Sequence, residues 1–174
     1  MKKVNLAIVG ATGVVGRKII EVIEERKFPY ENLRLFSSAK SAGSKLKVNG
    51  KEYVVEELKE DSFDDGNIDI AMFSAGGGTS AKFGPIAAKN KVVVVDNSSY
   101  WRMHDDISLI VPEVNPQDLN LEKGIVANPN CSTIQSVVPL KALYDTFGIE
   151  RIVYTTYQAV SGSGIKGIDR KSVV

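Results

Sequence analysis

The sequence contains 174 residues, of which 43% are hydrophobic and 25% are charged, as is typical of a globular protein with an apolar core. A net charge of +1 at pH 7 gives no general attraction to nucleic acid or to an anionic membrane, and no apolar stretch approaches the roughly 18 residues of a membrane-spanning helix. One cysteine excludes an internal disulfide, and with one histidine it cannot complete a four-ligand zinc site. These properties favour a reducing, cytoplasmic setting.

Short apolar runs alternate with helical patterns along the chain. Three nearly continuous apolar runs predict strands that are buried on both faces, at residues 4–10, 68–75 and 91–97. Apolar residues at helical spacing predict helices near 14–24, 79–89 and 132–144, and weaker signals predict strands at 32–38, 51–58 and 124–129. This alternation predicts a doubly wound α/β (Rossmann-type) domain.

The pattern changes toward the C-terminal end. In residues 150–164, β-branched and aromatic side chains partly alternate, which predicts a half-exposed strand and the entry to a second domain. We therefore expect a dinucleotide-binding domain at residues 1–130 and the beginning of a second, α+β domain at residues 131–174.

Three glycines follow the first predicted strand. Gly10, Gly13 and Gly16 form a G-x-x-G-x-x-G pattern where the strand gives way to a helix. Glycine at these points permits a tight turn, lets backbone N–H groups approach a pyrophosphate and allows the helix to pack closely on the strand. We favour nucleotide binding over a purely structural turn.

The end of the second predicted strand indicates which nucleotide is bound. An NAD site usually has a carboxylate there for the ribose 2′-hydroxyl, whereas residues 37–41 contain none. Lys40 with Ser38 and Ser41 can bind a 2′-phosphate, although a solvated loop is the alternative. NADP is favoured over NAD.

Two further segments follow buried strands at the sheet edge where α/β domains bind ligands. Residues 76–78 are three glycines that allow either a close backbone approach to a ligand or simple loop flexibility. Arg102 can grip a phosphate or a carboxylate with two parallel hydrogen bonds, and a surface arginine is the alternative.

The single cysteine, Cys131, stands at the boundary between a strand and a helix. A buried, inert cysteine is the commoner case, but a thiolate in the first helical turn is stabilised by unpaired N–H groups. Asn128 and Asn130 are candidates to orient the turn, with Ser132 and Thr133 as candidate caps. A nicotinamide, an activated thiol and an anion-binding arginine together indicate oxidoreduction through a thioester.

Several segments occur together in a known order. AIVGATGVVG, SSAKSAG, DNSSYWRM, NPNCSTIQ and YQAVSGSG stand in the order and approximate spacing of the aspartate-semialdehyde dehydrogenase family, which the chain resembles to about Asp169. The related N-acetyl-glutamyl-phosphate reductases share fold and chemistry, but their cysteine motif is closer to G-N-P-G-C-Y.

The resemblance implies NADPH-dependent reduction of L-aspartyl-4-phosphate to aspartate semialdehyde and phosphate, in lysine, threonine and methionine biosynthesis, with Cys131 as the nucleophile that carries the thioester. It also implies site residues. By motif these are Gly10, Thr12, Gly13, Val14 and Val15 for the pyrophosphate; Ser38, Lys40 and Ser41 for the 2′-phosphate; Ser161 and Gly162 for the nicotinamide; and Arg102, Gln158 and Asn130 for the substrate.

The family's chains are roughly twice as long, and their second half supplies a catalytic histidine and most of a homodimer or homotetramer interface. His104 does not match that histidine's motif, so no role is carried over to it. We therefore interpret the sequence as an N-terminal portion, with residues 131–174 beginning a catalytic and dimerisation domain. We expect the 174-residue chain to bind NADP(H) with little dehydrogenase activity. The alternatives are a catalytically silent NADP-binding module and a related acyl-phosphate reductase.

Overall fold

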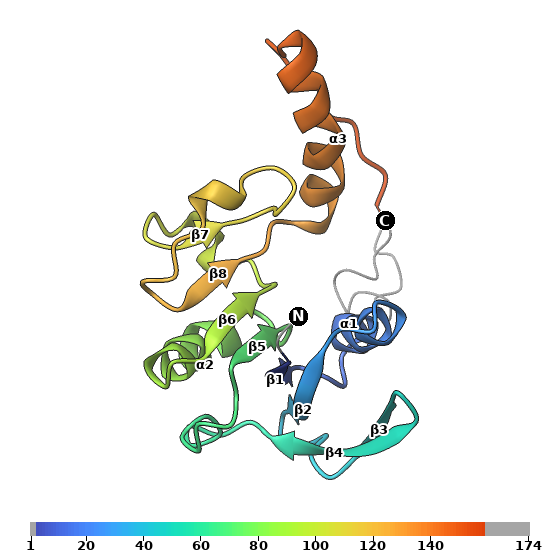
Figure 1. The fold of residues 1–174 in the computed structure, drawn as a ribbon, viewed down its shortest axis with the longest axis vertical. Coiled ribbons are helices and arrows are strands. Elements are labelled where there is room, and N and C mark those ends of the chain that lie inside the picture. The colour runs from blue at the N-terminus through green and yellow to red at the C-terminus, as the bar shows by residue number, and fades with distance from the viewer. Residues whose placement is uncertain (1–2, 159–174) are drawn as a thin grey trace, which may run out of the picture.

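The computed structural model describes residues 3–158 of the chain. A single eight-stranded sheet, with the strand order β3-β4-β2-β1-β5-β6-β8-β7, runs through the molecule, and helices α1 and α2 cover its two faces (Figure 1). The elements are β1 (Val4–Val9), α1 (Val14–Glu25), β2 (Tyr30–Ser37), β3 (Lys45–Val48), β4 (Lys51–Glu57), β5 (Ile70–Phe73), α2 (Gly77–Lys89), β6 (Val93–Asp96), η1 (Trp101–Met103), β7 (Ser108–Leu109), η2 (Pro116–Asp118), β8 (Ile125–Ala127) and α3 (Cys131–Phe147), where η marks a 3-10 helix.

Strand β1 lies in the middle of the sheet and pairs in parallel with β2 on one side and β5 on the other. Its alternate side chains enter opposite cores. Leu6 and Ile8 pack in the core beneath α1, while Ala7 and Val9 belong to the core beneath α2. Because both faces of the strand are covered, its residues 6–9 are all apolar and buried.

The core beneath α2 contains three phenylalanines from different segments. The ring of Phe63, in the connection between β4 and β5, lies 5.9 Å from that of Phe36 and 6.3 Å from that of Phe73, measured between centroids. All three side chains are fully buried. The connection of residues 58–69 therefore covers part of this sheet face without a long helix.

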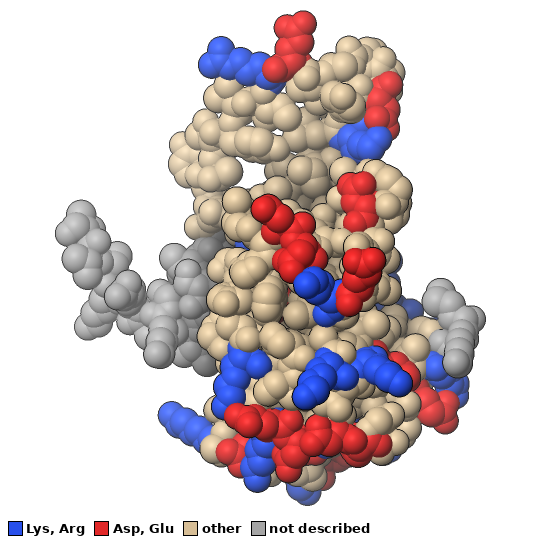
Figure 2. All heavy atoms as spheres, turned by 90° about the vertical axis from the view of Figure 1, so that its left-hand side faces the viewer, with Lys and Arg blue, Asp and Glu red and all other residues tan. Residues whose placement is uncertain are grey.

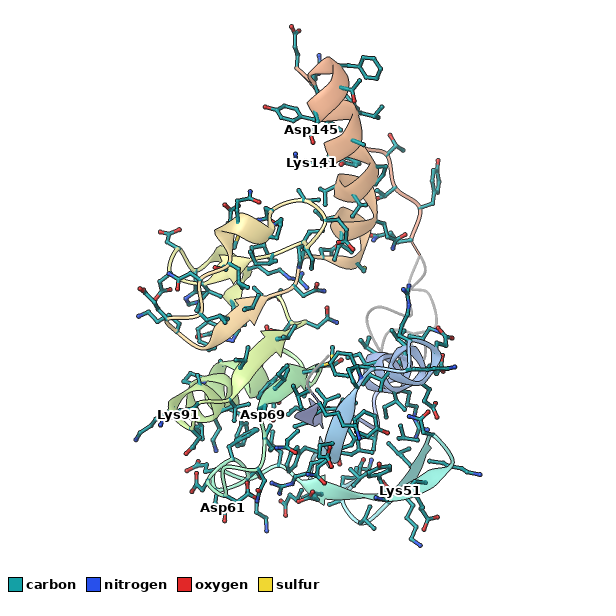
Figure 3. The ribbon with its side chains drawn as sticks, in the orientation of Figure 1. Lys51, Asp61, Asp69, Lys91, Lys141 and Asp145 are labelled. Carbon is teal, nitrogen blue, oxygen red and sulfur yellow. The ribbon has the colours of Figure 1, made fainter. Side chains whose placement is uncertain are left out.

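Helix α3 stands apart from the sheet and projects from the body of the molecule (Figure 1). None of its residues is buried, and Phe147 is 80% exposed. Figure 3 shows Lys141 and Asp145 on this helix, where they form an ion pair at 2.6 Å. The division into domains at residue 130 remains a prediction.

The structure confirms the doubly wound α/β fold and every strand predicted within residues 1–130. It adds strands β3 and β7 and the two 3-10 helices, which the sequence pattern did not predict. Strand β3 is antiparallel to β4 and is joined to it by Asn49 and Gly50, both at positive φ. Such a short edge strand carries too few residues for a recognisable alternation.

One predicted strand is wrong over the residues that the structure describes. Residues 151–158 pair with no strand and are exposed. Alternation produces a strand only where a neighbouring strand offers a ladder, and within the described part of the chain none lies beside this segment. The remainder of the predicted strand, residues 159–164, lies outside the described residues.

The surface carries both signs of charge. On the face shown in Figure 2, acidic and basic side chains are interspersed, most densely at the lower end of the molecule. No helix in residues 3–158 combines the length and the apolar character required to cross a bilayer.

Candidate dinucleotide and thiol site

The turn between β1 and α1 has glycine where a side chain does not fit. Gly10 has a φ of +89°, and a Cβ atom there would lie 2.5 Å from the carbonyl oxygen of Ser74. A Cβ atom on Gly16 would overlap the carbonyl oxygen of Gly10, because α1 packs directly against the turn. Gly13 is the N-cap residue of α1 and provides no side-chain cap, so the N–H groups of the first turn stay available to an anion.

A hollow of about 500 Å³ opens beside this turn and is called the dinucleotide hollow below. Gly10, Thr12 and Gly13 line one side of it, and Ser37 and Ser38 at the end of β2 line another. Its walls also include the apolar side chains of Leu58 and Phe83. The hollow therefore combines backbone donors for phosphates with apolar surface for a flat ring.

The segment that was expected to select the nucleotide forms a turn after β2. The N–H of Ser41 donates to the carbonyl oxygen of Ser38 at 2.9 Å, and Lys40 is exposed within this turn. The neighbouring strand β4 ends at Glu57, which pairs in register with Ser37, and Glu57 forms an ion pair with Lys59 at 3.5 Å. Sequence reasoning overlooked this carboxylate because it comes from a different strand.

A second hollow of about 370 Å³ contains the cysteine and is called the thiol hollow below. Asn97, Arg102, Asn130 and Cys131 line it, together with Val15 from the first turn of α1 and the glycine loop after β5. Ser74 lines both hollows, so they adjoin at the end of β5. This glycine segment, for which the sequence left two interpretations, lies at this junction, where Gly76 is the N-cap residue of α2 and Gly77 begins the helix.

The backbone holds the side chain of Arg102 in one orientation. Its Nε donates to the carbonyl oxygen of Asn128 at 2.9 Å, and its Nη2 donates to the carbonyl oxygen of Asn97 at 3.1 Å. The side chain of Asn128 in turn donates to that of Asn97 at 2.8 Å. Of the five guanidinium N–H groups, three donate to no acceptor in residues 3–158 and are free for a ligand in the thiol hollow.

Helix α3 begins at the cysteine. The side chain of Asn130 caps the helix by accepting a hydrogen bond from the N–H of Ser132 at 2.9 Å. The prediction of Ser132 and Thr133 as caps is therefore wrong. The helix starts at Cys131, one residue earlier than expected, so both of these residues lie inside it. Cys131 is exposed, and so the interpretation as a buried core residue is also wrong.

Of the remaining predicted substrate residues, Gln158 lies close to the cysteine. The side chain of Gln158 donates to the hydroxyl of Ser132, which brings it to the first turn of α3. His104 lies outside the residues that line the thiol hollow, and its ring is tilted by 55° against that of Trp101, with centroids 4.9 Å apart. Ser161 and Gly162 lie outside the described residues.

Sequence reasoning did not single out one residue that is hydrogen-bonded to the wall of the thiol hollow. Asp96, the last residue of β6, is fully buried and accepts hydrogen bonds from Ser80 and Ser98. The only signal in the sequence was an acidic residue at the end of an apolar run.

These features define a Rossmann-type dinucleotide-binding domain with a thiol exposed at the carboxyl edge of its sheet. Residues 5–122 match the family model described as "Semialdehyde dehydrogenase, NAD binding domain". The chain therefore belongs to the semialdehyde dehydrogenase family and carries its nicotinamide-dinucleotide-binding domain.

Known proteins support this assignment. The chain is 58% identical over 168 residues to the aspartate-semialdehyde dehydrogenase of Aquifex aeolicus, covering 95% of this chain and 49% of that protein. The crystal structure of aspartate semialdehyde dehydrogenase II from Vibrio cholerae superimposes with a TM-score of 0.88 at 50% identity, covering 97% of this chain and 50% of that one. The crystal structure of aspartate semialdehyde dehydrogenase with NADP from Candida albicans superimposes with a TM-score of 0.71 at 26% identity, covering 85% of this chain and 48% of that one. The chain thus spans about half the length of the relatives it matches.

Proposed function

We propose that this sequence supplies the NADP(H) site and the nucleophile of an aspartate-semialdehyde dehydrogenase. The observation that carries the proposal is the thiol hollow, where an exposed Cys131 at a capped helix start and a half-buried Arg102 line one space beside a dinucleotide turn. The substrate would be a small acyl phosphate, L-aspartyl-4-phosphate, and the products aspartate semialdehyde and phosphate. The names of the 58% and 50% identical relatives support the choice of acyl group.

The residues at the β1–α1 turn fit a dinucleotide. Gly10 and Gly16 leave no room for a side chain, and the uncapped start of α1 offers N–H groups to a pyrophosphate held by Thr12, Gly13, Val14 and Val15. When bound, NADPH supplies the hydride that reduces the acyl group. Ser161 and Gly162 would border its nicotinamide by family resemblance.

The choice of NADP over NAD rests on the turn after β2. Ser38, Lys40 and Ser41 offer hydroxyls and a cation, and no carboxylate lies within this turn. The carboxylate of Glu57 on the adjacent strand forms its ion pair with Lys59, which lowers its repulsion of a 2′-phosphate.

In the proposed first step, the thiolate of Cys131 attacks the acyl carbon of the substrate. A C–S bond forms, the C–O bond to phosphate breaks, and phosphate leaves with the electron pair, so that the enzyme carries a thioester. The three unused N–H groups of Arg102 would hold the phosphate group during this step. Asn130 would orient the thiol's turn, and Gln158, which donates to Ser132, would contact the rest of the substrate.

A titration with dinucleotides tests the cofactor proposal. The 174-residue chain should bind NADP⁺ more tightly than NAD⁺, and the variant Lys40→Ala should lose this preference, because the 2′-phosphate loses its cation. Lys47→Ala is a matched control, since Lys47 is an exposed lysine on β3, outside the turn that follows β2. Equal affinity for both nucleotides in the unaltered chain would reject the assignment to NADP.

Mass spectrometry tests the nucleophile. Incubation of the chain with L-aspartyl-4-phosphate should add one aspartyl group to Cys131, and hydroxylamine should remove it, as expected for a thioester. The variant Cys131→Ser should gain no such thioester. If the unaltered chain also gains none while it binds NADP⁺, the alternative of a dinucleotide-binding module without chemistry is favoured. Assembly into a homodimer or homotetramer remains a prediction.

A further inference from the structure

Asp96 is a buried carboxylate for which the proposed chemistry has no use. Its side chain is fully buried, and no lysine, arginine or histidine in residues 3–158 forms an ion pair with it. Burying a carboxylate without a cation is unfavourable, and an apolar side chain of similar size is often at least as stable in such a place. The location of its hydrogen bonds is therefore the informative feature.

The two carboxylate oxygens of Asp96 hold different segments. Oδ1 accepts a hydrogen bond from the hydroxyl of Ser80 in α2 at 2.5 Å. Oδ2 accepts two hydrogen bonds from Ser98, one from its hydroxyl at 2.6 Å and one from its backbone N–H at 3.2 Å. All donors are neutral, so the interaction fixes geometry rather than neutralising charge.

Both serine hydroxyls also accept a hydrogen bond from the same short segment. The hydroxyl of Ser98 accepts a hydrogen bond from the N–H of Tyr100 at 3.1 Å, and that of Ser80 accepts one from the indole Nε1 of Trp101 at 3.1 Å. The two relays therefore converge on residues 100 and 101. The next residue in the chain is Arg102.

Arg102 depends on this anchoring because its orientation is set by main-chain atoms. The guanidinium donates to the carbonyl oxygens of Asn97 and Asn128. The backbone of Asp96 takes part as well, since its carbonyl oxygen accepts from the N–H of Asn128 at 2.8 Å. The side chain of Asp96 thus anchors residues 98–101, and its backbone carbonyl holds the segment before Cys131.

We infer that Asp96 is a positioning residue that holds the segment before Arg102, through Ser98 and Ser80, so that the guanidinium meets an anion in the thiol hollow. This rests on the proposed function, in which that anion is the phosphate of an acyl phosphate. Asp96 itself touches no ligand, because its side chain is fully buried. Its effect reaches the site through the direction of Arg102.

Protection of Cys131 by inorganic phosphate measures the effect. Phosphate bound at Arg102 should slow alkylation of Cys131 by iodoacetamide, because both residues line the thiol hollow. Asp96→Asn replaces one acceptor oxygen by an NH₂ group, which faces donors, and should weaken phosphate protection by about tenfold or more. Ser80→Ala removes one relay and should weaken it by a smaller factor. Ser80 is buried and lines neither hollow, so this variant tests the relay without removing a group that faces the phosphate.

A second readout separates positioning from general destabilisation. Trp101 is the only tryptophan in the sequence, so its fluorescence reports the relay through Ser80. Asp96→Asn and Ser80→Ala should change this emission in the folded protein. Ser62→Ala is the matched control, because Ser62 is also a buried serine that accepts a backbone hydrogen bond, from Lys59 at 2.8 Å, and it should alter neither emission nor phosphate protection.

Each outcome has a defined meaning. If Arg102→Leu abolishes phosphate protection while the Asp96 and Ser80 variants keep full protection, the positioning role is overturned and the proposed function stands. If phosphate fails to protect even the unaltered chain, the proposed anion site is overturned, and the role of Asp96 with it. Should Asp96→Asn not fold, Ser80→Ala decides: a phosphate affinity equal to that of the unaltered chain overturns the inference.

Discussion

The side-chain oxygen of Asn130 accepts a hydrogen bond from the N–H of Ser132 at 2.9 Å. Cys131 is the residue between these two in the chain. The thiol is the first residue of α3 and is exposed. Its position relative to the helix start is thus determined by one asparagine.

Removal of this cap should loosen the start of α3. We expect Asn130→Ala to destabilise the helix start by about 1 kcal/mol, the usual cost of losing an N-cap. Faster hydrogen exchange at the amides of the first turn of α3 would report the change. Asn130→Ser, which keeps an acceptor oxygen, should restore the slow exchange, and unchanged exchange in Asn130→Ala would contradict the capping role.

The reactivity of Cys131 should reflect the helix terminus. We expect iodoacetamide to alkylate it about 1.5- to threefold faster at pH 7 than an unstructured peptide thiol, because the helix N-terminus stabilises a neighbouring anion, although a stabilised thiolate is also a weaker nucleophile. In Asn130→Asp the cap remains but a carboxylate stands beside the thiolate, so alkylation should slow down. A rate equal to that of the peptide thiol counts against activation by position.

Two glycines near helix starts should respond differently to alanine. Gly16→Ala should destabilise the protein by about 2–3 kcal/mol and weaken dinucleotide binding, because its Cβ atom would overlap the carbonyl oxygen of Gly10. Gly78, in the first turn of α2, has no atom within 4 Å of a Cβ position, and Gly78→Ala should leave stability unchanged or slightly increased. Urea denaturation of both variants tests the contrast, and equal stabilities would contradict it.

The raised pKa of Tyr53 leads us to expect a loss of stability at alkaline pH. Burial, and then the neighbouring hydroxyl of Tyr30, raise the pKa of Tyr53 from 10.0 to about 12. The folded protein therefore keeps a proton that the unfolded chain loses above about pH 10, so the contribution of Tyr53 is complete below pH 10 and declines as the pH rises toward 12.

Ultraviolet titration of tyrosinate absorbance measures this directly. The difference between the unaltered chain and Tyr53→Phe should isolate one phenol that ionises at about pH 12. Tyr157 is 96% exposed, and Tyr157→Phe should leave that late step in place. Persistence of the step in Tyr53→Phe would show that it belongs to another residue.

Local pattern was sufficient for the nucleotide turn and the buried strands. Gly10, Gly13 and Gly16 lie in one stretch of seven residues, and their roles depend on the turn that this stretch itself forms. Residues 6–9 are all apolar because their side chains enter the two cores alternately. An uninterrupted apolar run of this kind can be recognised in the sequence. The start of α3 was predicted to within one residue for the same reason.

The grouping of the site residues required the tertiary structure. Arg102 and Cys131 are 29 positions apart and line one hollow because β6 and β8 are neighbours in the sheet. The role of Asp96 depends on Ser80 and Ser98, which no spacing rule connects with it. The exposure of residues 151–158, where alternation predicted a strand, likewise depends on which segments lie alongside.

The sequence by itself determined the dinucleotide turn and the position of the cysteine at a helix start, because each follows from residues close together in the chain. It also determined the α/β fold and the family, through the order of elements and motifs along the chain. Only the tertiary structure decided that Cys131 lines one hollow with Arg102, and that Asp96 is buried with hydrogen bonds to Ser80 and Ser98. Those features arise where parallel strands bring distant segments to one edge of the sheet, and hydrogen bonds between such segments leave no periodic trace in the sequence.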